Sequence, residues 1–154
     1  MKSVLQRVTD ATVRVGDEVV GSIDRGLLVY LGVEKGDSEK DLDFLVRKIP
    51  KLRLFEDHDG KINLSLMDIG ASLLVVSQFT LCANLNKGNR PSFDPAADPD
   101  FAKIMYERFV DLVRQQGISV ANGTFGAHMK VSYTNEGPVT ILLESPKKQV
   151  DADK

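Results

Sequence analysis

Residues 72–81 read SLLVVSQFTL, an apolar run that ends abruptly in polar side chains. A short, partly β-branched run of this kind is typical of a strand buried on both faces, so we predict the central strand of a sheet here. Ser77 and Gln78 follow without a turn residue, and polar groups at a buried strand end must bond to each other, to water or to a ligand. A pocket at this end is one interpretation, and a strand that simply reaches the surface is the other.

Working outward, the run GLLVYLGV at residues 26–33 predicts a second strand buried on both faces. Two amphipathic stretches predict helices: one from Ser38 to the stop at Pro50, and one from Asp98-Pro99 to Gly117. Alternating or β-branched runs predict the remaining strands at residues 2–8, 11–15, 18–23, 52–55, 61–66, 118–121, 129–134 and 138–143. The pattern indicates one mixed α/β domain with about eight to ten strands and two main helices.

The chain has 154 residues, a net charge of −2 and a single cysteine, Cys82. This length suits one domain with its own core, which we expect to span residues 1–144. The polar residues 145–154 show no periodic apolar face, so we expect a disordered tail. One cysteine, no signal-peptide pattern and no apolar run long enough to cross a membrane favour the cytoplasm and no membrane partner.

Several common catalytic arrangements lack their residues. The only histidines are His58, in a predicted turn, and His128, at a predicted strand start, and we expect surface or structural roles for both. Two isolated histidines and one cysteine do not supply a zinc site, and no glycine-rich phosphate loop is present. We therefore expect no metal and no organic cofactor.

A second motif, NEGPVT at residues 135–140, offers backbone groups in place of ionisable side chains. A cis Gly137-Pro138 bond would turn two successive carbonyl oxygens to one side, where they could hold an ammonium group. Few X-Pro bonds in folded proteins are cis, so a trans Gly-Pro turn before a strand is the alternative.

Two basic clusters stand out against the acidic balance: residues 47–53, with two arginines and two lysines, and the loop that carries Lys87 and Arg90. Charge alone favours solvated surfaces over a nucleic-acid contact.

Both motifs together resemble the D-aminoacyl-tRNA deacylase family, formerly called D-tyrosyl-tRNA deacylase. SQFTL at residues 77–81 and NEGPVT at residues 135–140 match its two signatures, and collinear matches extend the resemblance over residues 1–144. The resemblance implies a single α/β domain with barrel-like β-sheets, assembled as a homodimer. The implied activity is hydrolysis of the ester between a D-amino acid and tRNA, a proofreading reaction that rejects L-aminoacyl-tRNA and acts to some extent on glycyl-tRNA.

The resemblance also implies where the site lies, at the interface of two subunits. It places Ser77, Gln78, Phe79 and Thr80 in the pocket of one subunit. From the other subunit it brings Gly137 and Pro138 as a cis pair. Met129 is implied as a pocket wall, and Arg7 is implied to fix the Gly-Pro segment.

The mechanism stays open between two accounts. In one, the terminal 2′-hydroxyl of the tRNA assists water, while backbone N–H groups of Phe79 and Thr80 stabilise the oxyanion. In the other, Thr80 is the nucleophile, although no base is evidently placed to activate it. Rival functions are a nucleic-acid-binding or scaffold protein without turnover, and an esterase without stereochemical preference.

Overall fold

The computed structural model describes residues 1–147 of the chain. Its strands are β1 (Lys2–Val15), β2 (Glu18–Gly32), β3 (Arg53–Glu56), β4 (Ile62–Ser65), β5 (Ser72–Ser77), β6 (Val120–Asn122) and β7 (Lys130–Glu144). Its helices are α1 (Glu39–Lys48), α2 (Leu66–Ile69) and α3 (Pro99–Arg114), with short 3₁₀ helices η1 (Ile49–Lys51) and η2 (Phe79–Cys82).

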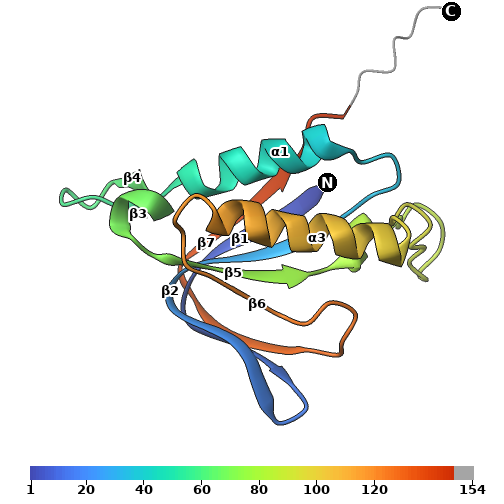
Figure 1. Cartoon of the computed structure of the whole chain (residues 1–154), viewed down its shortest axis with the longest axis horizontal. Coiled ribbons are helices and arrows are strands. Elements are labelled where there is room, and N and C mark those ends of the chain that lie inside the picture. Colours follow the sequence, from blue (N-terminus) through green and yellow to red (C-terminus); the bar gives the residue numbers. More distant parts are fainter. Residues whose placement is uncertain (148–154) are drawn as a thin grey trace, which may run out of the picture.

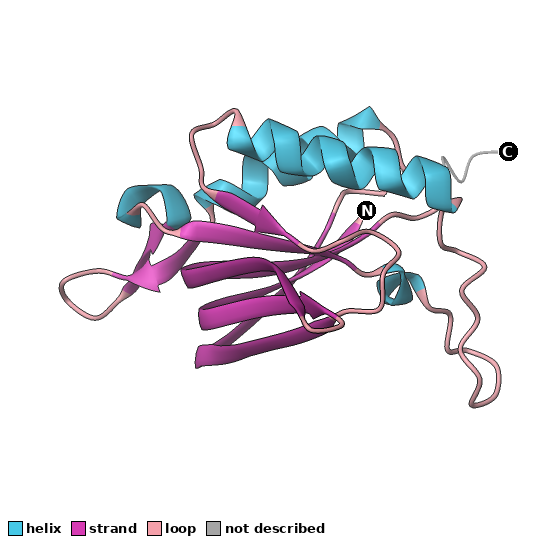
Figure 2. Ribbon diagram, turned by 60° about the horizontal axis from the view of Figure 1, so that its bottom comes forward, coloured by secondary structure: helices cyan, strands magenta, loops and turns pink. Residues whose placement is uncertain are grey.

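Five strands form one sheet in the order β6-β5-β2-β1-β7, and β3 and β4 form a separate hairpin. β5 runs parallel to both of its neighbours, whereas β1 is antiparallel to β2 and to β7. The two main helices, α1 and α3, lie side by side over one face of the sheet (Figures 1 and 2). This arrangement confirms a single mixed α/β domain with two main helices.

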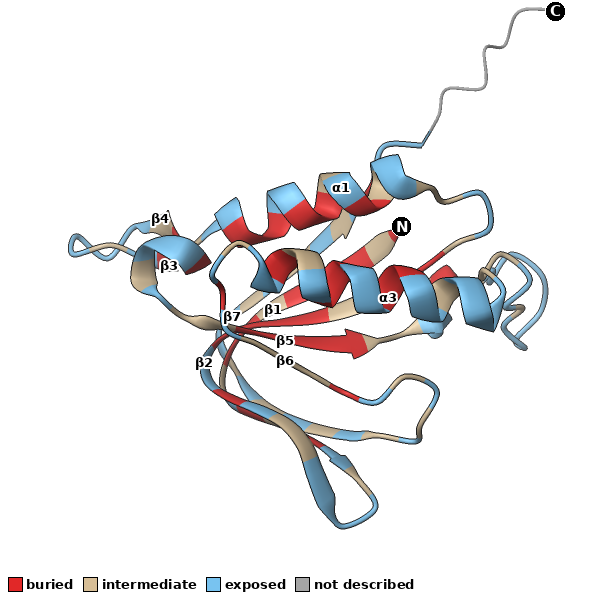
Figure 3. Cartoon of the chain, in the orientation of Figure 1, coloured by how far each residue is buried: buried red, intermediate tan, exposed pale blue. Residues whose placement is uncertain are grey.

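The core lies between these helices and the sheet. Buried residues on one face of β2 and β5, among them Val29 and Val75, pack against Leu45 of α1 and Phe109 of α3. A smaller cluster that includes Leu28 and Leu74 lies on the opposite face. Because β5 and the second half of β2 are covered on both faces, every side chain in residues 27–29 and 73–76 is buried, as their unbroken apolar runs predict (Figure 3).

Both main helices begin as predicted. At α1, Ser38 and Asp41 form a capping box, and the chain turns into η1 at Pro50. At α3, the Asp98 side chain accepts a hydrogen bond from the Asp100 N–H at 3.0 Å, with Pro99 in the first turn. The α-helix ends at Arg114, three residues before Gly117.

The expectation of barrel-like sheets was wrong. Within residues 1–147 the sheet stays open, because β6 pairs only with β5 and β7 pairs only with β1. Alternation along a strand predicts which side chains face the core, but it contains no information about whether the two outer strands meet.

The expected count of eight to ten strands was also too high, because three predicted breaks are irregularities inside long strands. β1 continues through Asp10, which has a φ of +52°, and β7 bulges opposite Arg7. β2 continues through Gly26, where a Cβ atom would lie 1.7 Å from the Ser72 carbonyl oxygen. A bulge leaves both flanks in the sheet, so polar residues or glycine do not by themselves mark a turn.

The predicted tail begins too early. Ser145 is buried, and its hydroxyl donates to Asp41 Oδ1 at 2.7 Å while accepting from the Met1 ammonium at 2.7 Å. These bonds tie the end of β7 to the first residue of the chain and to α1. Residues 148–154 of the expected tail lie outside the described residues.

Candidate active site

The first motif lies where β5 leaves the sheet. Ser77 is the last residue of β5 and pairs with Leu31 of β2, whose carbonyl accepts from the Gln78 N–H at 2.8 Å. The chain then turns into η2 against Gly32, where a Cβ atom would lie 3.0 Å from the Gln78 carbonyl oxygen. The strand therefore ends at residue 77, four residues earlier than predicted, and the motif forms a strand-to-helix corner.

A cavity of about 580 Å³ opens beside this corner, between the end of β5, the start of α3 and the segment before β7. Its walls are formed by Leu31, Val33, Val76, Ser77, Gln78, Phe79, Phe93, Ala96, Ala97, Pro99, Ala102, Tyr106, Phe125, Gly126, Ala127, His128, Met129 and Val131. A space of this volume is in the range of small-molecule sites, so the interpretation of the motif as a pocket is supported.

The cavity walls carry little ionisable chemistry. His128 is exposed, and no carboxylate, lysine or arginine is among the lining residues. The Tyr106 hydroxyl donates to the Val75 carbonyl oxygen at 2.9 Å, and burial raises the pKa of Tyr106 to about 12, so this phenol is neutral at physiological pH. The cavity can thus supply shape, amide and hydroxyl groups, and backbone donors.

Thr80 lies next to the cavity without lining it. Its Oγ1 atom accepts a hydrogen bond from the Gln78 side-chain amide, and the Thr80 side chain is otherwise exposed. Phe79 and Thr80 are the first two residues of η2, and the first N–H groups of a helix have no carbonyl partner within it. The backbone N–H groups of Phe79 and Thr80 therefore lie next to the cavity wall formed by Ser77 and Gln78.

The second motif forms a bulge in β7. Gln6 pairs with Thr140 and Val8 with Asn135, so residues 136–139 bulge opposite Arg7 alone. The Gly137-Pro138 bond is cis, the isomer that the resemblance implied, and both residues are exposed. The two residues thus lie at a free edge of the sheet, with their backbone accessible.

The buried Arg7 side chain fixes this bulge through hydrogen bonds to backbone carbonyls. It is 6% exposed, and its Nε donates to the Glu136 carbonyl at 3.1 Å while Nη1 donates to the Leu54 carbonyl at 3.0 Å. Gly137 has a φ of +129°, and a Cβ atom there would lie 3.0 Å from Arg7 Nη2. The arginine therefore packs against the bulge closely enough that only glycine fits without displacement.

A second group of side chains braces the bulge on its other flank. Asn135 Oδ1 accepts from the Val139 N–H at 3.1 Å, and Asn135 Nδ2 donates to Thr140 Oγ1 at 3.0 Å. Gln6 Nε2 donates to the same Thr140 oxygen at 3.1 Å, and the Tyr133 hydroxyl donates to Gln6 Oε1 at 2.5 Å. A chain of four polar side chains thus joins the bulge to β1.

The structure divides the eight predicted site residues into two groups. Ser77, Gln78, Phe79 and Met129 line the cavity, with Thr80 adjacent. Gly137, Pro138 and Arg7 form the other group at the bulge. Strand pairing leads from Ser77 across β2 and β1 to Leu143 of β7, three strands away. Gly137 lies six residues before Leu143, in the bulge opposite Arg7, so its separation from Ser77 is on the order of 20 Å.

Sequence reasoning missed the wall that the approach to α3 contributes. Phe93, Ala97, Ala102 and Tyr106 line the cavity from this side. Ala102 and Tyr106 are four residues apart on α3, a spacing that places them on one helix face, but apolar residues at that spacing look the same as core residues. The bracing role of Gln6 and Tyr133 likewise depends on strand pairing and has no local signal.

Three further observations concern metal-binding groups, His58 and membrane-spanning helices. Among residues 1–147, no three His, Cys, Asp or Glu side chains gather in a group that could hold a metal ion. His58 lies in the turn between β3 and β4, exposed beside Asp59, as predicted for a surface histidine. No helix in this part of the chain is long and apolar enough to cross a membrane.

Comparison with known proteins places these features in a family. The family model described as D-Tyr-tRNA(Tyr) deacylase matches residues 4–144. A protein of Geobacter metallireducens named D-aminoacyl-tRNA deacylase is 57% identical over 147 residues, which cover 96% of this chain and 97% of that protein. A protein of the same name from Thermotoga petrophila is 54% identical, with 96% and 99% covered.

Two solved structures share the fold. The c-Myc DNA unwinding element binding protein superposes with a TM-score of 0.90 at 45% identity, covering 96% of this chain and all of that one. A probable eukaryotic D-amino acid tRNA deacylase has a TM-score of 0.79 at 21% identity, with 93% and 98% covered, and shows the fold alone. With a family model that spans nearly the whole described chain and relatives of matching length, the chain belongs to the D-Tyr-tRNA(Tyr) deacylase family.

Proposed function

We propose that this chain hydrolyses the ester bond of D-aminoacyl-tRNA to a free D-amino acid and tRNA, and so recycles mischarged tRNA. The observation that carries the proposal is the cavity at the end of β5, walled by Ser77, Gln78, Phe79 and Met129, in a member of the deacylase family. The relatives are named D-aminoacyl-tRNA deacylase, the activity proposed here, and they match this chain over nearly its full length.

The proposed chemistry needs positioning more than strong acids or bases. An aminoacyl ester is already activated, so water adds to its carbonyl carbon, and the C–O bond to the terminal ribose then breaks and leaves a ribose hydroxyl. The N–H groups of Phe79 and Thr80, at the start of η2, would stabilise the oxyanion. The neutral cavity wall suits assistance by the tRNA's own 2′-hydroxyl. Thr80, whose hydroxyl accepts from the Gln78 side-chain amide, is the alternative nucleophile.

We propose that the active enzyme is a homodimer with a composite site. Within one chain the bulge lies on the order of 20 Å from the cavity. Because Gly137 and Pro138 are exposed at a free sheet edge, a second copy could bring them to the cavity of the first. Arg7 and Met129 would then act as a brace for the bulge and as a pocket wall.

We further propose that chirality is selected by exclusion. Carbonyl oxygens of Gly137 and Pro138 would accept the substrate ammonium, and the rigid bulge would leave no space for an L side chain. Glycine has no side chain to exclude, so glycyl-tRNA should be hydrolysed to some extent. The proposal includes no metal or organic cofactor and a cytoplasmic location, where charged tRNA is used.

A second candidate is a nucleic-acid-binding protein without turnover. The 45% identical structure is named for binding a DNA unwinding element, which favours this alternative over a generic scaffold. A net charge of −2 argues against extensive phosphate contacts, so the esterase remains the better supported function.

The test compares matched D-tyrosyl-tRNA and L-tyrosyl-tRNA as substrates of the purified, metal-free protein. Rapid loss of the D ester alone is the expected result. Loss of both esters would retain the hydrolase but refute chiral exclusion. Loss of neither would favour the binding protein.

A further inference from the structure

The loop between η2 and α3 projects at the right-hand end of the view (Figure 1), and Phe93, Ala96 and Ala97 of this connection line the cavity. Its base is closed by two backbone hydrogen bonds between Asn84 and Ser92, at 2.7 and 3.1 Å. The enclosed residues 85–91 read LNKGNRP and contain two cations and no carboxylate. This segment is therefore a small, positively charged projection on an acidic protein.

The loop is joined to the cavity through an aromatic pair. Phe93 follows the loop directly, and its ring meets Phe79 edge-to-face with centroids 5.1 Å apart. Both phenylalanines line the cavity, yet Phe93 is 39% exposed and Phe79 is 55% exposed. Apolar rings that stay this accessible at a cavity mouth offer faces on which a base can stack.

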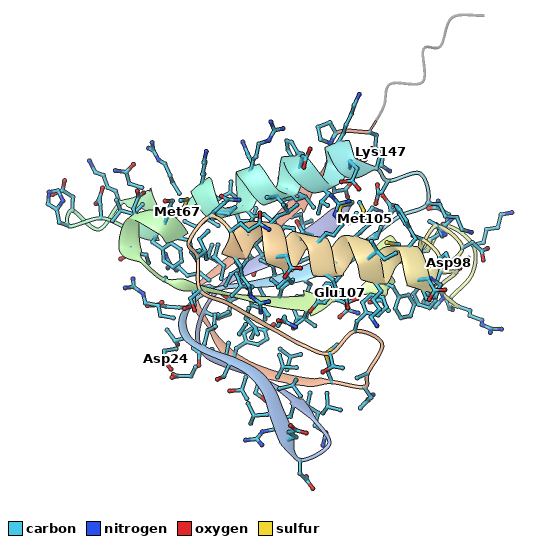
Figure 4. The ribbon with its side chains drawn as sticks, viewed as in Figure 1. Asp24, Met67, Asp98, Met105, Glu107 and Lys147 are labelled. Carbon is cyan, nitrogen blue, oxygen red and sulfur yellow. The ribbon has the colours of Figure 1, made fainter. Side chains whose placement is uncertain are left out.

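The two loop cations are available for an external partner. Lys87 and Arg90 are exposed, and neither forms an ion pair with any residue in 1–147. The nearest carboxylates in sequence, Asp94, Asp98 and Asp100, lie outside the loop. Asp98 (labelled in Figure 4) caps α3 and Asp100 lies in its first turn, where helix N–H groups and the helix dipole favour negative charge. Asp98 and Asp100 thus have a local partner in the start of α3, whereas no ion-pair partner of Lys87 or Arg90 lies within residues 1–147.

The other basic cluster is placed differently. Arg47 and Lys48 occupy the last turn of α1, which leads to β3 at the opposite end of the molecule (Figure 1). There they complement the helix dipole, and no residue of the cavity wall comes from α1 or β3. Position therefore separates two clusters that charge alone left equivalent.

We infer that Lys87, Arg90 and Phe93 form a strand-binding surface for the single-stranded 3′ end of tRNA. This inference rests on the proposed function. If the aminoacylated 3′-terminal nucleotide lies in the cavity, the preceding nucleotides of the same strand must leave the cavity across the neighbouring surface. The strand would leave past Phe93, which offers a stacking face, and its phosphates would meet Lys87 and Arg90. Aromatic faces beside a positively charged path are the usual means of binding single strands.

The test measures binding separately from turnover. Fluorescence anisotropy with labelled, uncharged tRNA would compare the wild-type protein with Lys87→Gln/Arg90→Gln and with a control pair, Arg47→Gln/Lys48→Gln. We expect the loop variant to bind about tenfold more weakly at 100 mM salt, and its log–log salt slope to fall by about 1.4, since each single-strand phosphate contact contributes about 0.7. The control pair should bind as the wild type does.

A second arm uses a D-aminoacyl ester of adenosine, which lacks the preceding phosphates. The loop variant should hydrolyse it within about twofold of the wild-type rate, while KM for D-aminoacyl-tRNA rises with kcat unchanged. An unchanged salt slope, equal losses in both variant pairs, or tighter binding of a single-stranded DNA of equal length would each overturn the inference. Failure of the wild type on both esters would count against the hydrolase alone, because the binding arm still decides the role of the loop.

Discussion

The corner at residues 77–80 and the bulge at residues 136–139 are both built from backbone, yet they are supported in opposite ways. The corner follows from a buried strand that runs directly into η2, and its one side-chain bond in the structure joins Gln78 to Thr80. The bulge lies at an exposed edge and is held by long side chains, chiefly Arg7 and Asn135. A motif inside the sheet takes its shape from the fold, whereas a motif at the edge needs its own scaffold.

The largest effect should come from placing a side chain in the bulge itself. We expect Gly137→Ala to lower kcat/KM for D-tyrosyl-tRNA by about 100-fold, equivalent to about 2.7 kcal/mol. Alanine at position 137 would have to adopt a φ of +129°, which L residues rarely adopt. Its Cβ would also lie only 3.0 Å from Arg7 Nη2 and from the Val139 side chain. Steady-state kinetics measure kcat/KM. Size-exclusion chromatography with light scattering should show that the variant has the same oligomeric state as the wild type. Retained D-specific activity would refute the role of the Gly-Pro segment.

Loss of the brace should have the next largest effect. Arg7→Lys keeps the charge but cannot reach both the Glu136 and Leu54 carbonyls, so we expect the free energy of unfolding to fall by about 2 kcal/mol. Activity on D-tyrosyl-tRNA should fall about 20-fold, because the bulge loses its fixed position. Urea denaturation and kinetics test the two effects, and full activity at reduced stability would show that Arg7 serves only the fold.

The corner should tolerate side-chain loss better than the bulge does. Thr80→Val removes the hydroxyl but keeps the shape and the backbone N–H, so we expect kcat to fall by less than tenfold. Thr80→Ser is the matched control that restores the hydroxyl. A loss in the valine variant of about 10⁴-fold, recovered in the serine variant, would instead identify Thr80 as the nucleophile.

A smaller and more selective change should follow at the far end of the bracing chain. Tyr133→Phe removes one hydrogen bond to Gln6, worth about 1 kcal/mol. We expect D-ester hydrolysis to fall about threefold while L-ester hydrolysis rises relative to it, since a looser bulge excludes L side chains less well. A general loss of folded protein would lower both rates by the same factor, and that result would contradict a positioning role.

The smallest effect on activity should come from a site remote from both motifs. Burial raises the pKa of Asp41, but hydrogen bonds from Ser145 and Ser38 outweigh it and hold this pKa below its usual value of 3.8. The Asp41 contribution to stability is therefore present above pH 4 and is lost as pH falls through the lowered folded pKa. Asp41→Asn should lower the free energy of unfolding by about 1 kcal/mol at neutral pH. In acid, the difference in this free energy between variant and wild type should disappear.

Thermal unfolding from pH 2.5 to 7 measures this gap, and deacylation by the same variant provides a reference for all the others. Because Asp41 contacts neither the cavity nor the bulge, the D-to-L ratio of rates should stay at the wild-type value. A changed ratio would mean that stability alone alters selectivity, and it would weaken the conclusions drawn from Arg7 and Tyr133.

The sequence by itself predicted the two main helices and the buried strands, and it contained the two motifs. Unbroken apolar runs predicted the buried strands β2 and β5, and capping residues predicted where α1 and α3 begin, because these signals act within a few residues. The resemblance carried by SQFTL and NEGPVT led to the family, which the family model and the relatives confirm.

Tertiary structure decided what depends on partners distant in the chain. It kept the sheet open, joined predicted short strands through bulges, and buried Ser145 against Met1. It also separated the two motifs, since strand order places β5 and β7 three strands apart. Strand order and edge exposure result from long-range pairing, so no local pattern of residues contains them.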